Sequence, residues 1–245
     1  MQIPEIVKLS LAETFGAFVL LLMGAGSILT ATATNPGGDN LIVIAFAHGL
    51  AIFIGVSAVG HVSGAHFNPA VTFAFLITGK IQPLTALAYW GSQLLGGIIG
   101  VLILSAVFSG AGDLTDMSNA AEATNLGATA LHGDVSPAAG IFIEVALTFI
   151  LVFVIFQVAV DEKGPGMIAP LAIGMTITLA ALMGGPLTGA ALNPARAFAP
   201  ALIAGYWTNH FVYWIGPLLG GGLGALAAAY LMQGMKLRLP GRKGD

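Results

Sequence analysis

The sequence predicts an all-α membrane protein with six transmembrane helices and two re-entrant half-helices, related by an inverted repeat. Three observations lead to that prediction. Of the 245 residues, 57% are hydrophobic and only 8% are charged, whereas a soluble domain carries about 25% charged residues. The apolar residues form six runs long enough to cross a bilayer. Two shorter apolar segments begin with the same Asn-Pro-Ala motif.

The six long runs match the thickness of a hydrocarbon core. A helix rises about 1.5 Å per residue, so about 20 apolar residues cover roughly 30 Å. Short polar or Gly-containing breaks separate the runs. The predicted spans are residues 8–31, 41–60, 83–108, 137–160, 167–186 and 208–234.

The basic residues predict that both termini lie on the cytoplasmic side of the cell (plasma) membrane. An even number of spans places both ends on one side. Seven of the eight Lys and Arg residues share that side, as the positive-inside rule requires. These are Lys8, Lys80, Lys163, Lys236, Arg238, Arg242 and Lys243. The eighth, Arg196, lies in an apolar segment and needs another explanation.

Two apolar segments, residues 68–79 and 193–204, are too short to span a membrane. About a dozen helical residues cover only about 18 Å, which suggests re-entrant half-helices. An irregular, Gly-containing stretch precedes each segment. Non-helical backbone at membrane depth is tolerated only where it is buried in protein or lines a wet cavity. The two segments therefore predict a water-lined pathway.

The half-helix segments are copies of one another. Residues 63–74 read SGAHFNPAVTFA and residues 188–199 read TGAALNPARAFA, with seven of twelve positions identical. The flanking spans repeat in the same order, and the segment at Glu13 matches the segment at Glu144. Because a unit of three spans is odd, the second copy enters from the opposite side, and such a repeat places its site near the midplane.

The repeat defines the expected domain organisation. We expect a single channel domain over residues 1–245, with the first repeat at 6–108 and the second at 137–234. Residues 109–136 form an extracellular connecting loop that folds over the outer vestibule. This loop is acidic and rich in small residues, and its composition indicates no particular chemistry.

The Asn-Pro motif is a helix-start signature, with Asn as the N-cap and Pro at the first helical position. Inverted symmetry brings the two helix N-termini together, and each presents roughly half a positive charge that repels cations. A water molecule that accepts hydrogen bonds from Asn68 and Asn193 must point its own hydrogens outward, which interrupts a proton wire.

The irregular stretches before the motifs leave carbonyl groups that cannot pair within a helix. We expect these carbonyls to form a polar ladder along the pathway. They belong to Gly64, Ala65, His66, Gly189, Ala190 and Ala191.

The chain resembles the aquaporin or major intrinsic protein family over about residues 6–234, with similarity to prokaryotic aquaporins and plant tonoplast intrinsic proteins. The resemblance rests on both motif segments, the Glu13 and Glu144 segments and the order of the spans. It implies an aquaporin-like fold, a passive channel rather than an enzyme, and a homotetramer with one pore per subunit. The pore motif residues that it implies are Asn68, Pro69, Ala70, Asn193, Pro194 and Ala195.

The resemblance also implies a narrow selectivity filter formed by His48, Ala181, Ala190 and Arg196. An Arg within a membrane costs about 2.5–3.5 kcal/mol on insertion scales, so Arg196 is expected to line a wet cavity. The usual water-selective pattern has an aromatic residue on the second span and His on the fifth. Two outcomes therefore stay open here. His48 reaches across and supplies the missing donor, or the small Ala181 and Ala190 leave a wider opening.

Other positions favour water. Glycerol facilitators of the family usually carry Asp directly after the filter Arg, and this chain carries Ala197. We interpret the chain as a water channel of relaxed width, with ammonia, urea, glycerol or dissolved gases as candidate second solutes. Strict water selectivity is the alternative.

Two acidic residues, Glu13 and Glu144, lie within spans. Intramembrane carboxylates often mark proton pathways, so a proton relay is one interpretation. The other is structural, with each carboxylate accepting hydrogen bonds from the irregular backbone before its half-helix. The repeat favours the structural interpretation, because both copies need the same support.

Aromatic and His residues near the span ends have ordinary explanations. The pairs Tyr89-Trp90, Tyr206-Trp207 and Tyr213-Trp214 fit interfacial belts. We expect His66 to face the pathway at the inner vestibule. For His132 and His210, surface packing is the default.

Two other classes of function compete with a passive channel. A proton-coupled secondary transporter also uses inverted repeats and broken helices. A membrane enzyme finds no support, because no Ser/His/Asp, metal-ligand or phosphate-loop constellation is present. No basic patch indicates nucleic acid binding. We expect no cofactor and no metal; the expected partners are the lipid bilayer, water and small neutral solutes.

Overall fold

The computed structural model describes residues 4–109 and 115–232, whose regular elements are helical. The first span combines α1 (Glu5–Val19), the π-helical segment η1 (Leu20–Ala25) and α2 (Gly26–Thr34). The other long helices are α3 (Leu41–Ser63), α5 (Pro83–Ser109), α7 (Pro137–Ile155) with η3 (Phe156–Val160), α8 (Ala169–Thr188) and α10 (Val212–Leu231). The shorter elements are α4 (Pro69–Ile77), α6 (Thr115–Ala123), η2 (Asn125–Gly127), η4 (Gly166–Ile168) and α9 (Pro194–Ala204).

Six helical segments of the described chain are long and apolar enough to cross a membrane, which confirms the predicted fold class. They are Glu5–Thr34, Leu41–Ser63, Pro83–Phe108, Pro137–Val160, Gly166–Thr188 and Val212–Leu231. The third and fourth spans have the predicted bounds, and the sixth is shorter than predicted. The first, second and fifth spans are longer; the second continues up to Gly64, whose φ of +84° ends the helix. Residues 233–234, at the end of the predicted second repeat, lie outside the described residues, as do Lys236, Arg238, Arg242 and Lys243.

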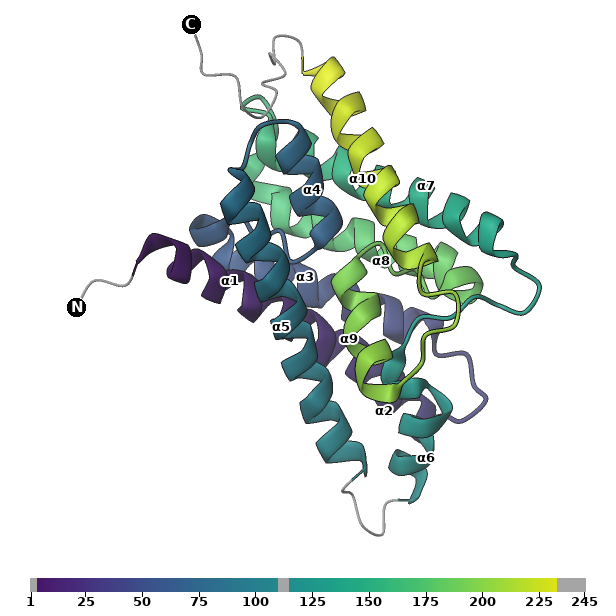
Figure 1. The fold of residues 1–245 in the computed structure, drawn as a ribbon. Coiled ribbons are helices and arrows are strands. Elements are labelled where there is room, and N and C mark those ends of the chain that lie inside the picture. The colour runs from purple at the N-terminus through teal and green to yellow at the C-terminus, as the bar shows by residue number, and fades with distance from the viewer. Residues whose placement is uncertain (1–3, 110–114, 233–245) are drawn as a thin grey trace, which may run out of the picture.

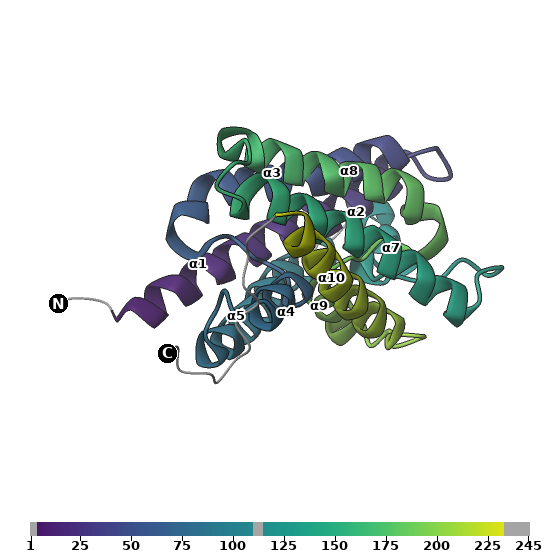
Figure 2. The same ribbon diagram turned by 90° about the horizontal axis from the view of Figure 1, so that it is seen from above.

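The long helices pack in three close pairs, α1 with α5, α3 with α8, and α7 with α10 (Figure 2). Glycines allow the backbones to approach. A Cβ on Gly96 of α5 would collide with the Thr14 carbonyl of α1, and a Cβ on Gly220 of α10 would collide with the Val145 carbonyl of α7. Gly96 and Gly220 occupy equivalent positions of the two copies. Small residues at such crossings are typical of helix packing in lipid.

The half-helices α4 and α9 lie end to end between the long helices, with their N-termini toward one another (Figure 1). Each begins as its sequence predicts. The Asn68 side chain accepts a hydrogen bond from the Ala70 N–H at 2.8 Å, and the Asn193 side chain accepts from the Ala195 N–H at 2.9 Å. Pro occupies the first turn of both helices. The two N-termini therefore meet in the middle of the molecule.

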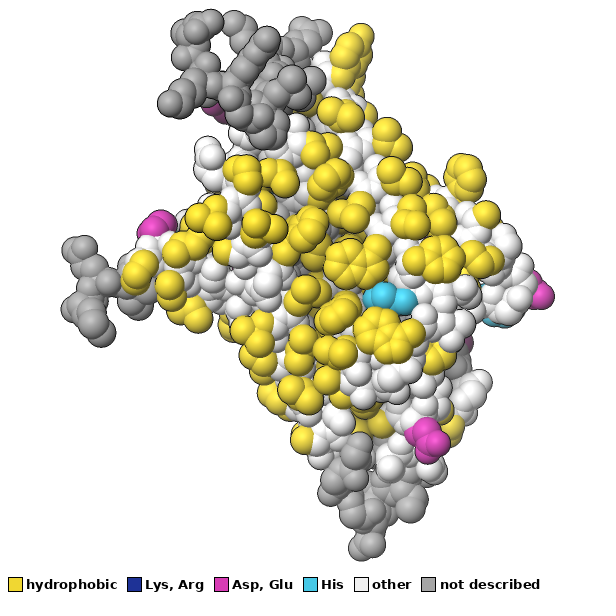
Figure 3. All heavy atoms as spheres, in the orientation of Figure 1, with side chains coloured by type: hydrophobic (Ala, Val, Ile, Leu, Met, Phe, Trp, Pro, Cys, Tyr) yellow, Lys and Arg dark blue, Asp and Glu magenta, His cyan; other side chains and the backbone are white. Residues whose placement is uncertain are grey.

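Apolar side chains are spread over the face of the helix bundle in Figure 3, and acidic groups appear only toward the edges of that face. Large exposed residues such as Leu84 and Phe142, with about three quarters of their surfaces accessible (76% and 77%), lie on the spans. Buried polar residues line the interior instead. This distribution is the reverse of that in a soluble protein and fits a bundle solvated by lipid.

We expect Gly96→Ala to destabilise the fold, because the new methyl group meets the backbone of Thr14 rather than a flexible side chain. Overpacking of this kind costs about 1–3 kcal/mol or more. Gly91→Ala, on the same helix with no atom within 4 Å of its Cβ, is the matched control. Thermal unfolding in detergent measures both. Equal midpoints for the two variants would contradict this packing argument.

Candidate functional site

The chain reverses direction before each half-helix through the same unusual backbone conformation. Ala65 and Phe67 have positive φ values of 54° and 50°, and the equivalent Ala190 and Leu192 have 43° and 52°. Non-glycine residues rarely adopt this region, and only a surrounding structure that holds them keeps them there. The reversed segments therefore need strong fixed partners.

Glu13 supplies those partners in the first copy. Its carboxylate is fully buried and accepts four hydrogen bonds. They come from the Ser63 hydroxyl (2.6 Å), the backbone N–H groups of His66 (3.0 Å) and Phe67 (2.7 Å), and the Gln93 amide (2.7 Å). Hydrogen bonds to a charged acceptor are roughly twice as strong as neutral ones. The carboxylate thus ties the reversed segment to α1 and α5.

Glu144 does the same in the second copy. It accepts from the Thr188 hydroxyl (2.7 Å) and from the backbone N–H groups of Ala191 (2.9 Å) and Leu192 (2.8 Å). The position equivalent to Gln93 is Pro217, which has no donor. The repeat therefore conserves the support of the backbone but not the whole polar network.

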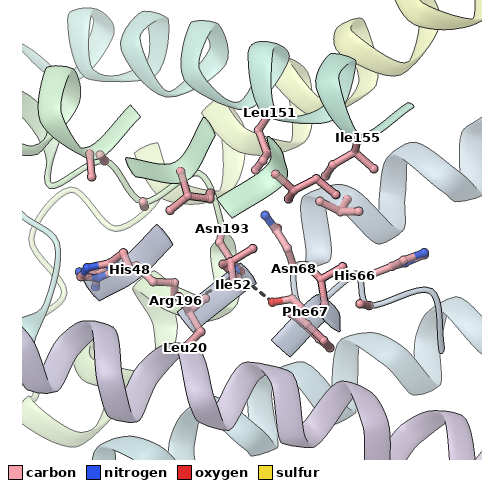
Figure 4. A pocket seen from close by; sticks show the side chains of 18 of the residues that line it. Leu20, His48, Ile52, His66, Phe67, Asn68, Leu151, Ile155, Asn193 and Arg196 are labelled. Carbon is pink, nitrogen blue, oxygen red and sulfur yellow. Dashed lines mark hydrogen bonds between the residues drawn. The ribbon is translucent and has the colours of Figure 1, made fainter. Parts of the chain in front are cut away.

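The two half-helices are joined at their tips by exchanged hydrogen bonds. The Asn68 amide donates to the Leu192 carbonyl at 2.8 Å, and the Asn193 amide donates to the Phe67 carbonyl at 2.9 Å (Figure 4). An amide group has two N–H donors. Each Asn therefore commits one donor to the opposite copy and keeps one for a molecule beside it.

A cavity runs past these tips and is lined by both copies. Figure 4 shows His48 and Arg196 at one end, Asn193 and Asn68 in the middle, and His66 at the other end. We call these the Arg196 end and the His66 end. Apolar side chains form the rest of the wall, among them Leu20, Ile52, Leu151, Ile155, Ile173 and Ile177. The residues expected to supply carbonyls also line it, namely Gly64, Ala65, His66, Gly189, Ala190 and Ala191.

Arg196 is buried and held from two sides. One guanidinium nitrogen donates to the Gly127 carbonyl at 2.8 Å, and another lies 3.3 Å from Nε2 of His48. Its Nε has no partner among the described residues.

The tautomer of His48 follows from its two contacts. Its Nδ1 lies 2.8 Å from the Ile44 carbonyl, which can only accept, so Nδ1 carries the hydrogen. Nε2 is then the acceptor that faces Arg196. In this state His48 has no free N–H for a solute. Ala181 and Ala190 also line the cavity, and the side chain of each is only a methyl group.

The connecting segment contributes to the site, although its composition indicated no chemistry. Gly127, at the end of η2, provides the carbonyl that binds Arg196. Asn125, Leu126 and Gly127 all have positive φ values of 47°, 56° and 78°. Thr129 lines the cavity, and its buried hydroxyl has no partner in the described chain. Only the Asn and the Gly of this turn are residues that favour such a conformation, and Leu126 is not, so the turn could not be predicted from the sequence.

The His66 end carries a different polar network. His66 Nδ1 lies 3.0 Å from the Thr72 hydroxyl, which also accepts from Gln93 at 2.9 Å. The imidazole packs against the rings of Phe75 and Tyr89, with centroids 4.2 and 5.2 Å away. Within residues 4–109 and 115–232, no cluster of His, Asp and Glu could hold a metal ion. The His66 end thus carries a hydroxyl, an amide and an imidazole, whereas the Arg196 end carries a guanidinium and an imidazole. The backbone that supports the two ends is related by the repeat.

The assignment of Tyr89 and Tyr213 to interfacial belts is wrong. Both are buried, and their hydroxyls donate to the carbonyls of Ser63 (2.7 Å) and Thr188 (2.9 Å). These carbonyls belong to the last residues of α3 and α8, where helices leave acceptors unpaired. Position near a span end says nothing about which face of the helix a residue occupies. Trp207 remains 45% exposed, as a belt residue would be.

His210 lies in the turn before α10 and is part of an aromatic cluster with Phe198, Trp207 and Trp214. The Trp214 indole N–H donates to its Nε2 at 3.1 Å. Partial burial lowers the pKa of His210 below its ordinary value of 6.5. Burial therefore favours the neutral imidazole, in which Nε2 can accept from Trp214.

The model of the family described as "Major intrinsic protein" matches residues 1–228. The chain belongs to this family. "Probable aquaporin TIP3-2" from Arabidopsis thaliana is 42% identical over 242 residues, covering 94% of this chain and 85% of the relative. "Lens fiber major intrinsic protein" from Canis lupus familiaris is 41% identical over 223 residues, covering 90% and 80%.

The fold also matches a solved structure. The X-ray structure of the aquaglyceroporin from Plasmodium falciparum superposes with a TM-score of 0.79 at 24% identity, covering 94% of this chain and 97% of that one. At this identity the match shows the fold alone. The family relationship identifies the chain as a passive membrane channel for water rather than an enzyme.

We expect Glu13→Gln and Glu144→Gln to weaken the fold. In each variant an amide NH2 replaces an oxygen that accepts hydrogen bonds, so donors face donors. Leaving buried donors unsatisfied costs about 1–3 kcal/mol. Less folded protein should reach the membrane, while the flux ratio of solute to water per folded channel stays unchanged. A well-folded Glu13→Gln channel with an altered response to a proton gradient would instead support the proton relay.

Proposed function

We propose that water crosses the membrane through the passage between the tips of α4 and α9, with Asn68 and Asn193 as its central donors. The observation that carries the proposal is the pair of exchanged hydrogen bonds at these tips. They fix both amides beside the cavity and leave each with one N–H for a passing water molecule. The water then accepts at its oxygen and points its hydrogens away from the centre, which interrupts a proton wire.

Two further features support the exclusion of ions. The N-termini of α4 and α9 meet at the centre, and each contributes roughly half a positive charge. Arg196 adds a full charge at its end of the same passage. The surrounding wall is mostly apolar, so an ion that loses its water shell finds few polar groups to replace the lost water ligands. Together these features raise the barrier for cations and protons but not for a neutral molecule.

For the solute range, we propose a constriction of relaxed width at the Arg196 end, formed by His48, Ala181, Ala190 and Arg196. His48 contacts Arg196 and the Ile44 carbonyl, and the two alanines add only small side chains to the lining of the same cavity. Urea, glycerol, ammonia or dissolved gases are then candidate second solutes. A strictly water-selective channel is the alternative.

The membrane arrangement is also part of the proposal. Lys8, Lys80 and Lys163 support cytoplasmic termini through the positive-inside rule. We propose the cell membrane as the location, and the resemblance to plant tonoplast intrinsic proteins gives an internal membrane as the alternative. A homotetramer with one pore per subunit follows from the same resemblance. Cross-linking in membranes and labelling of engineered termini test the two points.

Stopped-flow swelling of proteoliposomes tests water conduction. We expect water permeability well above that of empty vesicles, with a low activation energy, no saturation and no response to a proton gradient. Arg196 and the helix dipoles should keep the proton leak at the level of empty vesicles. Permeability equal to that of empty vesicles would overturn the proposed function. Saturation together with a response to the proton gradient would favour a transporter.

The His48→Ala variant tests the constriction. Removing the imidazole widens the Arg196 end, so urea or glycerol flux should rise relative to water by about fivefold, the effect of roughly 1 kcal/mol on a barrier. Water flux should change less, because water already passes. Parallel flux measurements on one vesicle preparation give the ratio. An unchanged ratio would mean that His48 does not set the aperture.

A further inference from the structure

We propose that Gly24, which does not itself line the passage, determines which solutes pass by leaving the space that the His48 ring occupies. The inference deepens the proposed function and rests on it, since it concerns the constriction at the Arg196 end. Gly24 acts through His48 and is therefore a positioning residue.

The contact between the two residues is close. Gly24 lies buried in η1, the π-helical segment of the first span. A Cβ at this position would lie 2.7 Å from Cδ2, 2.8 Å from Nε2 and 3.1 Å from Cγ of His48. Carbon atoms pack at about 3.5–4.0 Å. No side chain other than hydrogen fits here while the ring keeps its place.

The ring is held on its other sides as well. Nδ1 is bonded to the Ile44 carbonyl on its own helix, and Nε2 faces Arg196. The cavity borders the ring on the remaining side, because His48 is also one of its lining residues. A methyl group at position 24 would push the imidazole away from the first span and toward the cavity, which Ala181 and Ala190 also line. It would also break the contact with Arg196.

The repeat provides an independent argument from size. At the positions equivalent to Gly24 and His48, the second copy carries Ile155 and Ile173, and both line the same cavity. The first copy thus pairs glycine, the smallest residue, with the large imidazole ring of His48. The second copy instead pairs two isoleucines, which are of intermediate size. Because the two copies share the same backbone arrangement, we infer that the small size of Gly24 compensates for the large volume of the His48 ring.

The π-helical segment supports Arg196 through a second contact. Ala25, next to Gly24, packs against Gly127, where a Cβ would lie 2.9 Å from the Ala25 Cβ. Gly127 provides the carbonyl that binds Arg196. One segment of the first span therefore lies behind both partners of the guanidinium. Segments of this kind occur frequently at functional sites.

Gly24→Ala, His48→Ala and the double variant form the experiment, in proteoliposomes with flux normalised to channel density. We expect Gly24→Ala to lower the urea-to-water and glycerol-to-water ratios about fivefold. In the His48→Ala background the same substitution should have no effect on either ratio, because there is no ring to displace. Gly26→Ala, two residues away, is the control. Its Cβ meets only the flexible end of Leu104, at 3.1 Å.

A second variant keeps the test decisive if Gly24→Ala does not fold or the wild-type channel passes no urea. Gly24→Val combined with His48→Ala places a side chain from the first span into the volume that the ring has left. The raised solute ratio of His48→Ala should then fall back toward the wild-type ratio. A merely structural role for Gly24 would move protein yield but not this ratio.

Two results would overturn the inference. One is a Gly24→Ala effect of the same size with and without His48. The other is a ratio in the Gly24→Val and His48→Ala double variant equal to that of His48→Ala alone. Wild-type vesicles without water conduction would overturn the proposed function itself. A conducting wild type with unchanged ratios in the Gly24 variants would overturn only the role of Gly24.

Discussion

Irregular backbone in the middle of a bilayer persists only if its polar groups find partners within the protein. In this chain two buried carboxylates meet that requirement. Glu13 and Glu144 each bind the reversed segment that precedes a half-helix, and each does so mainly through backbone N–H groups. Tyr89 and Tyr213 satisfy the carbonyls on which the preceding spans end. With these four residues in place, the chain can stop halfway across the membrane and turn back.

Once the two half-helices and the backbone before them are held in place, the side chains at the two ends of the passage can differ. The first copy places His66, Thr72 and Gln93 in a hydrogen-bonded row at one end. The second copy places Arg196 at the other end, where it meets His48 and Gly127. None of these residues has an identical counterpart in the other copy. Symmetry therefore governs how the backbone is supported, and departures from symmetry supply the chemistry of the passage.

The sequence predicts most of the frame, because its physical signals are strong and local. Span length follows from apolar runs, and the half-helices follow from the Asn-Pro motif together with a run too short to span. The spans and the membrane fold are confirmed, whereas the roles assigned to the filter residues stay predictions. The positions of Asn68 and Asn193 at one cavity could be anticipated because inversion brings helix N-termini together.

The details that the sequence did not reveal depend on contacts between distant segments. Gly127 lies in a turn with three successive left-handed residues, and no pattern in the sequence marks its carbonyl as a partner of Arg196. The tautomer of His48 depends on a carbonyl one turn away and a guanidinium far along the chain. The environment of Tyr89 was predicted wrongly because transmembrane spans are apolar on all sides. The periodicity of their sequence therefore does not distinguish the face toward lipid from the face toward the other helices. Such features become visible only when the helices are packed.

The width of a narrow passage is set by the layer behind its wall as much as by the wall. Protein interiors are close-packed, so a lining side chain can withdraw only where the next layer leaves room. Gly24 leaves such room for His48, and Ala25 and Gly127 fit closely behind Arg196. A comparison of filter residues alone would treat His48 as one fixed obstacle. The same ring opens or narrows the passage according to a residue that no solute touches, so the aperture is a property of the packed first span as well as of the filter.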